Sequence, residues 1–145
     1  MLRRYEVGKI VSRLSEIYVR DRRMFYEICG RLLIYCLAIG DERVAEMLRR
    51  ELRRDLDRVP PKFLPLLRID FDCRRLSLRD RILCLCSKMA IGRRLYFWDV
   101  FPVFYSVFKS GKIRDIVFLV KWFGLVMFKN YGVLSLDEIL EGRGV

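Results

Sequence analysis

The sequence contains no histidine, no glutamine and no threonine, and its single asparagine is Asn130. Without histidine the chain lacks the most common general base and the imidazole ligand of zinc sites. It also lacks a glycine-rich phosphate loop and a Gly-x-Ser-x-Gly motif. Asp70 and Asp72 form an Asp-x-Asp pair, but nothing beside them resembles the rest of a two-metal site. We therefore expect a protein that is not an enzyme and that uses no cofactor and no metal.

Scarce asparagine and glutamine beside abundant arginine and glutamate are typical of proteins from hyperthermophiles. The chain also has an odd number of cysteines, at positions 29, 36, 73, 84 and 86, with no Cys-x-x-Cys pair. We interpret these five residues as small buried apolar side chains. A disulfide is the less favoured interpretation, although disulfides are less rare inside the cells of hyperthermophiles than elsewhere.

Long apolar runs are missing as well. The first ten residues, MLRRYEVGKI, contain no apolar segment of the kind found in a signal peptide. The most apolar stretch, residues 113–128, is sixteen residues long and includes Arg114, Asp115 and Lys121, so it is too short and too charged for a membrane span. We expect it to form a buried core helix, in a protein that is intracellular or part of a virion.

Positive charge is what the chain has in excess. It holds 29 basic and 18 acidic residues, a net charge of +11, and 22 of the basic residues are arginine. A net charge this large disfavours a compact monomer through self-repulsion, which an anionic partner would relieve. Residues 59–112 carry most of the excess, with eleven basic and four acidic residues. The planar arginine side chain is suited to holding phosphate oxygens in pairs.

The first part of the chain, residues 1–59, reads as basic amphipathic helices. Apolar residues recur every three or four positions over residues 2–39, as one long helix or as two helices with a break at residues 20–23. Gly40 should end this helical stretch, Asp41 should cap the next helix, and Pro60 with Pro61 should stop it. Residues 60–76 are predicted to be an irregular, proline-containing connector, with a short extended piece near residue 70.

The last part, residues 77–145, is predicted to be a helical core. SLRD at 77–80 and SLDE at 135–138 resemble capping boxes that begin helices, and Gly92 is a suitable helix end. Further helices are expected over residues 100–109 and 113–129. The sequence thus predicts an all-α fold, one compact domain over residues 1–145 with five to seven helices.

An aromatic run lies inside this last part. Seven of the thirteen residues from 96 to 108 are aromatic, and basic residues flank the run. On a helix that begins near Val100, the side chains of Phe101, Phe104, Tyr105 and Phe108 share one face, which predicts a core stripe. Tyr96 and Trp98 precede that helix beside Arg93 and Arg94, so they could still face a partner.

Candidate contacts for an anionic partner are arginines and lysines near turns and helix ends. Arg79 and Arg81 fall in the first turn of a predicted helix, where the helix dipole disfavours cations unless a phosphate is bound there. The full candidate set is Arg49, Arg50, Arg53, Arg54, Arg74, Arg75, Arg79, Arg81, Arg93, Arg94, Lys109 and Lys112.

These observations favour a structural protein that binds nucleic acid without reading its sequence, with DNA weakly favoured over RNA. A coat protein that packages DNA in a hyperthermophilic archaeal virus fits this description, acting as a homo-oligomer or in a larger assembly. A small helical subunit of a ribonucleoprotein complex would fit it too. Without nucleic acid, the same features would suit an oligomeric protein-interaction module or a protein that attaches to an anionic membrane surface through its basic helices.

Overall fold

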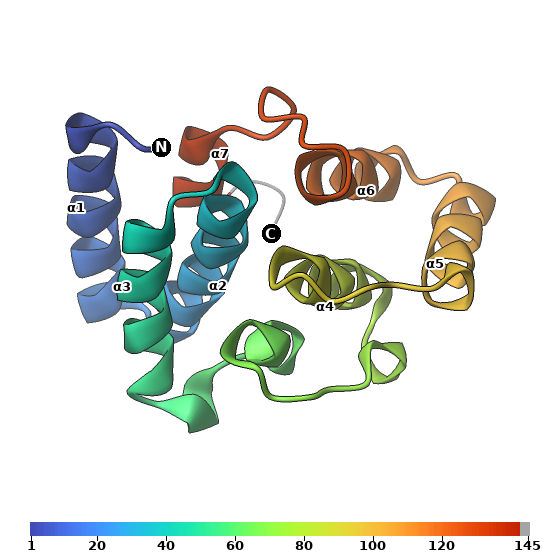
Figure 1. Ribbon diagram of the computed structural model, residues 1–145, viewed down its shortest axis with the longest axis horizontal. Helices are drawn as coiled ribbons and strands as arrows, with labels where there is room; N and C mark the ends of the chain where they lie inside the picture. Colours follow the sequence, from blue (N-terminus) through green and yellow to red (C-terminus); the bar gives the residue numbers. More distant parts are fainter. Residues whose placement is uncertain (143–145) are drawn as a thin grey trace.

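Seven α-helices and three short 3₁₀ helices form the fold in a computed structural model that describes residues 1–142 (Figure 1), and that range contains no strand. The α-helices are α1 (Arg4–Arg20), α2 (Arg22–Ile39), α3 (Glu42–Arg53), α4 (Leu78–Ala90), α5 (Phe97–Ser110), α6 (Ile113–Val126) and α7 (Leu136–Leu140). The 3₁₀ helices are η1 (Leu56–Arg58), η2 (Pro61–Leu67) and η3 (Cys73–Arg75). The predicted all-α architecture is confirmed, and the last three residues of the predicted domain lie outside the described residues.

The helix boundaries in the first third follow local capping signals. Asp21 lies between α1 and α2, and its carboxylate accepts hydrogen bonds from the backbone N–H groups of Arg23 and Met24. Gly40 ends α2 with a positive φ of 82°, a conformation that glycine adopts without steric cost. Asp41 then caps α3 by accepting a hydrogen bond from the N–H of Val44. The predicted break at 20–23 and both predicted caps are confirmed.

The connector between α3 and α4 is irregular, as expected, but it contains 3₁₀ turns instead of an extended strand. The α3 helix ends at Arg53, seven residues before Pro60, and η1 and η2 follow. Residues 69–72, where the sequence predicted a short extended piece, form no strand. An isolated strand without a partner strand is not stable. The Phe63 ring of η2 packs directly on Gly30 of α2, where an added Cβ would lie 2.3 Å from the ring.

Helix α2 is the centre of the molecule. It contacts α1, α3, α4, α6, α7 and η2, and twelve of its eighteen residues are buried. Figure 1 shows α1 and α3 on one side of α2, with α4 and α6 on the other and α5 at the far edge. Arg31 of this helix and Lys62 of η2 are buried, and both pair with Glu27 of α2. Lys62 also reaches Asp80 of α4, with 2.9 Å between Nζ and Oδ1.

The cysteines are buried, but two of them are paired. Cys73 of η3 and Cys84 of α4 form a disulfide with their Cα atoms 5.6 Å apart, which corrects the interpretation of all five as free apolar side chains. Spacing along the chain could not show this pairing, because the irregular connector determines where Cys73 lies. Cys29, Cys36 and Cys86 are free and buried, and burial raises the pKa of the Cys36 thiol to about 12.

The two predicted capping boxes have different outcomes. Ser135 caps α7, since its hydroxyl accepts a hydrogen bond from the N–H of Glu138. Ser77 precedes α4 at the expected place but makes no side-chain cap hydrogen bond, so this part of the prediction is wrong. The acidic partner expected there, Asp80, instead forms the ion pair with Lys62 described above.

Candidate functional site

The aromatic run on α5 is largely exposed, which overturns the prediction of a core stripe. Phe101, Tyr105 and Phe108 are 50%, 55% and 56% exposed, whereas Val103 and Val107 are completely buried. Both faces of α5 are apolar, and the small valines form the face that packs against the rest of the protein. Among the four ring residues expected in the core, Phe104 is the one that is partly buried, with its ring 5.3 Å from that of Phe123.

The exposed rings begin before the expected helix start. Helix α5 begins at Phe97 instead of near Val100, because Asp99 accepts a hydrogen bond from the N–H of Tyr96 and fixes the first turn. The rings of Tyr96 and Trp98 stack in parallel with their centres 4.8 Å apart. Both residues are exposed, in agreement with the prediction that they could face a partner.

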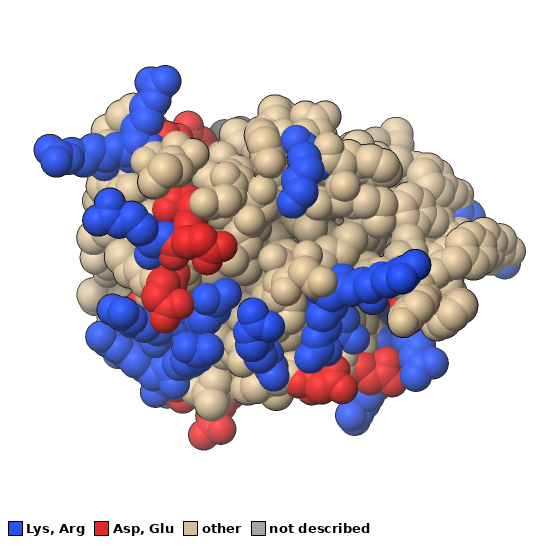
Figure 2. Space-filling model, viewed as in Figure 1, with Lys and Arg blue, Asp and Glu red and all other residues tan. Residues whose placement is uncertain are grey.

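Helix α6 is buried along one side only, so the prediction that it is buried almost all round is wrong. Phe118 and Trp122 face the core, whereas Ile113, Val117 and Val120 are exposed. We define the aromatic surface as the exposed apolar residues of α5, α6 and their flanking turns. They are Tyr96, Phe97, Trp98, Phe101, Tyr105, Phe108, Ile113, Val117, Val120, Met127 and Phe128. Figure 2 shows that the surface over α5 and α6 is mainly uncharged.

Charged side chains gather elsewhere, over α3 and the connector that follows it (Figure 2). We define the basic surface as the exposed arginines from the second half of α3 to η3. They are Arg50, Arg53, Arg54, Arg58, Arg68, Arg74 and Arg75. Arg58 and Arg68 were absent from the predicted set. Their position in the basic segment between α3 and η3 could have indicated them from the sequence. In the structure, Arg68 is exposed at a turn, with a φ of 62°.

Several arginines of the basic surface have acidic neighbours. Arg54 pairs with Glu51 at 3.3 Å, Arg58 pairs with Asp55 at 3.0 Å, and Arg74 pairs with Asp72 at 3.1 Å. The hydrogen bonds from Arg74 lower the pKa of the Asp72 carboxyl. Exposed pairs of this kind contribute little to stability, so a phosphate can replace the carboxylate at small cost.

Three arginines of the basic surface have no such neighbour. Within residues 1–142, Arg53, Arg68 and Arg75 form no ion pair with a carboxylate, and all three are exposed. The Arg75 guanidinium lies over the ring of Phe71, 6.0 Å from its centre, and the residue is exposed to solvent. These three cations can therefore reach an external anion without breaking an internal ion pair.

Three of the predicted contact residues are engaged inside the chain. Arg49 donates to the carbonyl of Leu66 and pairs with Glu46, and its side chain is only 15% exposed. Arg79 pairs with Asp115 at 3.0 Å, which connects α4 to α6. Arg81 donates to the carbonyls of Arg74 and Leu76. The conflict expected between the helix dipole and Arg79 and Arg81 is thus met by acceptors within the protein.

The remaining predicted residues border the aromatic surface. Arg93 pairs with Asp70 at 3.0 Å, and Arg94 beside it is exposed. Lys109 and Lys112 are exposed at the other end of α5, and the Lys109 ammonium lies 5.5 Å from the centre of the Tyr105 ring. The structure therefore separates the twelve predicted residues into the basic surface, internal contacts and the ends of α5.

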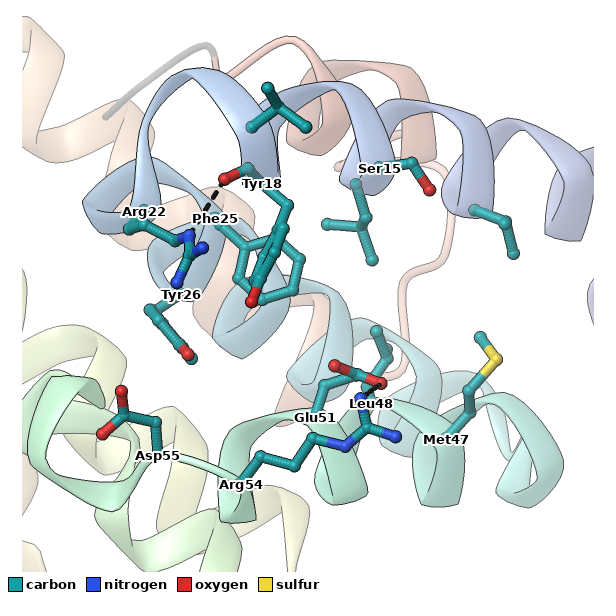
Figure 3. Close-up of a pocket in the computed structure, with 13 residues that line it drawn as sticks. Ser15, Tyr18, Arg22, Phe25, Tyr26, Met47, Leu48, Glu51, Arg54 and Asp55 are labelled. Atoms are coloured by element: carbon teal, nitrogen blue, oxygen red, sulfur yellow. Dashed lines mark hydrogen bonds and ion pairs between the residues drawn. The ribbon is translucent and has the colours of Figure 1, made fainter.

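A groove of about 680 Å³ lies between α1, α2 and α3 (Figure 3). Its walls are mostly apolar or aromatic, and its charged groups already have partners, such as Arg54 with Glu51 and Arg22 with the carbonyl of Tyr18. Burial and the Asp55 carboxylate raise the pKa of Tyr26 at one end. Nowhere in residues 1–142 do three or more acidic or cysteine side chains come together as a metal site.

No helix in the described part of the chain is long and apolar enough to cross a membrane. Comparison with models of protein families finds no match, and no curated protein and no solved structure matches the chain. The aromatic surface and the basic surface are therefore the features that bear on function.

Proposed function

We propose that the protein binds the phosphate backbone of nucleic acid through the basic surface, without reading base sequence and without catalysing a reaction. The observation that carries the proposal is the exposed, unpaired state of Arg53, Arg68 and Arg75 in a chain with a net charge of +11. Cations that neutralise phosphates release condensed counterions, and this release drives binding that is independent of sequence.

The chemistry of the basic surface also favours phosphate. Arginine holds two phosphate oxygens at once through its planar guanidinium, and six of the seven arginines here lie within the 23 residues from Arg53 to Arg75. The side chains come from α3, η1, η3 and the turn at Arg68, so the surface does not present one regular helix to a groove of DNA. Contacts with the backbone, rather than with base edges, suit such a surface.

The role that we favour is structural, as part of an assembly. A protein that grips phosphates without reading bases can cover nucleic acid of any sequence, which is what a DNA-packaging coat requires. The net charge opposes close packing of bare copies, and the nucleic acid would neutralise that repulsion. We therefore expect copies to assemble on long DNA at low salt, with DNA weakly favoured over RNA.

The test compares two triple variants with the same change in net charge. Arg53, Arg68 and Arg75 are changed to serine in the first, and Arg3, Arg4 and Arg43 in the second. The control residues are also exposed, but they lie at the starts of α1 and α3, whereas the basic surface begins in the second half of α3. Figure 1 shows the course of both helices. Affinity for duplex DNA and for single-stranded DNA and RNA of mixed sequence is measured by fluorescence anisotropy at several salt concentrations.

For the unchanged protein we expect the logarithm of affinity for duplex DNA to fall linearly with the logarithm of salt, by about 0.9 per phosphate neutralised. In the first triple variant the slope should decrease by the contribution of about three phosphate contacts. In the control variant it should decrease by the contribution of about one contact or none. Equal losses in both variants would show that the net charge acts without a defined surface. A flat salt response of the unchanged protein would refute nucleic-acid binding altogether.

A further inference from the structure

Nucleic-acid binding at the basic surface leaves the aromatic surface without a role. Five exposed rings follow one side of α5 at intervals of one to four residues, and those of Phe97, Phe101 and Tyr105 stack along the helix with centres 5.0 Å and 6.1 Å apart. Monomeric proteins seldom expose apolar patches of this extent unless the patch binds another protein or a membrane.

The charges around the aromatic surface are mostly positive. Residues 93–131 contain seven basic and only two acidic residues. Both acidic side chains are engaged, since Asp99 accepts from the N–H of Tyr96 and Asp115 pairs with Arg79. One carboxylate from outside this part of the chain, that of Asp70, pairs with Arg93 at 3.0 Å. The exposed cations at the edges of the surface are Arg93, Arg94, Lys109, Lys112, Arg114 and Lys129. An occupant of this surface must therefore combine an apolar interior with negative charge at its boundary.

We propose that the aromatic surface embeds in the headgroup region of an anionic lipid membrane, with α5 and α6 lying on the membrane. This attachment goes beyond the proposed nucleic-acid binding and uses different residues. Phenylalanine and aliphatic side chains would enter the acyl boundary, while the rings of Tyr96, Trp98 and Tyr105 would lie at the headgroup level. The cations at both ends of α5 would contact lipid phosphates, as basic residues beside an embedded helix do.

Two other occupants fit the surface less well. A second copy in a two-fold contact would bring the same cationic edges together, which costs energy in a chain that already carries +11. Bases of a single strand stack on aromatic rings, above a groove of positive charge that follows the backbone. Here the part of the surface that α6 supplies is aliphatic, with Ile113, Val117 and Val120 exposed, and these side chains offer bases no stacking.

The chain contains its own reporter for this proposal. Trp98 is 68% exposed on the aromatic surface, whereas Trp122 is 3% exposed in the core. Vesicles of phosphatidylglycerol mixed with phosphatidylcholine should shift the emission of Trp98 to shorter wavelength, and vesicles of phosphatidylcholine alone should bind at least about tenfold more weakly. In Trp98→Phe the spectral shift should disappear while co-flotation with anionic vesicles persists.

Two tyrosines provide a matched pair of variants. Tyr105 is 55% exposed on the aromatic surface, Tyr5 is 59% exposed on α1, and each ring lies under a lysine four residues later, at 5.5 Å and 5.7 Å. Tyr105→Ser should weaken flotation with anionic vesicles by about fivefold, because an embedded ring is lost, and Tyr5→Ser should leave it unchanged. If Tyr105→Ser fails to fold by circular dichroism, Phe97→Ser, at a position 72% exposed, takes its place.

The outcomes separate this proposal from the proposed function. Membrane attachment predicts that Tyr105→Ser keeps its affinity for duplex DNA, and that the serine triple variant of the basic surface keeps its flotation. Equal flotation of Tyr105→Ser and Tyr5→Ser would overturn membrane attachment. It would also be overturned by sedimentation showing a dimer that Tyr105→Ser dissociates, or by a Trp98 shift caused by single-stranded DNA but not by vesicles.

Discussion

Helices α2 and α5 are both rich in apolar residues, yet they have opposite relations to the core. Twelve residues of α2 are buried and it contacts six other elements, whereas α5 buries only Val103 and Val107 and packs mainly on α4 and α6. The large rings are inside in one region and outside in the other. An apolar helix therefore has a surface that favours burial. That surface can be buried against the rest of the protein or against a separate partner.

The charges of the two regions differ in the same way. At α2 the cations of Arg31 and Lys62 are buried, and both pair with Glu27, which is partly buried. The cations beside α5 are exposed, and most of them have no carboxylate close by. A region whose charges are satisfied internally is suited to stability, and a region whose cations face outward is suited to binding.

The largest difference between the regions should appear when a core side chain is shortened. Leu32→Ala in α2 removes a completely buried side chain and leaves a cavity among the elements around the helix. We expect it to lower the free energy of unfolding by about 2–5 kcal/mol. Chemical denaturation followed by circular dichroism measures the change, and a loss below about 1 kcal/mol would mean that α2 is not the centre of the core.

The connector between the two regions depends on a covalent link. Changing Cys73 and Cys84 together to serine removes the disulfide that closes a loop between η3 and α4. For a loop of this length we expect a loss of about 2–3 kcal/mol, which should also follow reduction of the unchanged protein. Cys86→Ser serves as the control, because it places a serine at a buried cysteine position without breaking the disulfide. Unaltered stability under reducing conditions would contradict a disulfide in solution.

A smaller effect is expected where α2 meets α3. The buried Asp41 carboxylate accepts hydrogen bonds from the N–H groups of Leu2 and Val44. Although burial alone raises the pKa of Asp41, these hydrogen bonds outweigh it and the net shift is downward. Leu2 and Val44 donate to different oxygens of this carboxylate and an amide offers only one, so we expect Asp41→Asn to lose about 1–2 kcal/mol near neutral pH.

The pH dependence follows from the direction of this shift. A carboxyl whose pKa is lower in the folded state contributes stability above its unfolded pKa of about 4, and this contribution is lost as the pH falls through the folded value. Urea denaturation of the unchanged protein and of Asp41→Asn at pH 7 and at about pH 2 should show a smaller difference at the acid end. Asp57→Asn, at an exposed position of η1, serves as the control.

The smallest effect should come from α5. Phe101→Ala removes a half-exposed ring, and we expect the free energy of unfolding to change by less than about 0.5 kcal/mol. Phe104→Ala, three residues later, should cost more because that ring packs on Phe123. Thermal unfolding of the two variants measures the difference. A larger loss of stability in Phe101→Ala than in Phe104→Ala would mean that the exposed face of the aromatic run packs in the core.

Much of the fold could be predicted because its boundaries depend on local chemistry. Gly40, Asp41 and Ser135 act through backbone groups within a few residues, so the sequence alone indicates them. At Ser77 the capping box is absent, and the Asp80 carboxylate that would complete it pairs instead with Lys62 of η2, which is distant in sequence. The pairing of Cys73 with Cys84 likewise depends on the course of an irregular connector.

The candidate site was harder to predict because it depends on which face of a helix is covered. The spacing of Phe101, Tyr105 and Phe108 places them together but does not show whether they point inward. The buried Val103 and Val107 occupy the other face and follow a helical spacing equally well. Likewise, counting charges indicated a basic middle segment, but only the structure shows that Arg49 and Arg79 are engaged in internal ion pairs.

The packing of Phe63 on Gly30 has a consequence for how sequences with this fold can vary. Any side chain at position 30 would meet a ring that is completely enclosed, since its Cβ would lie 2.3–2.4 Å from three atoms of Phe63. The two positions therefore constrain each other although 33 residues separate them. Among sequences that share this fold, alanine at position 30 should therefore occur together with a smaller residue at position 63.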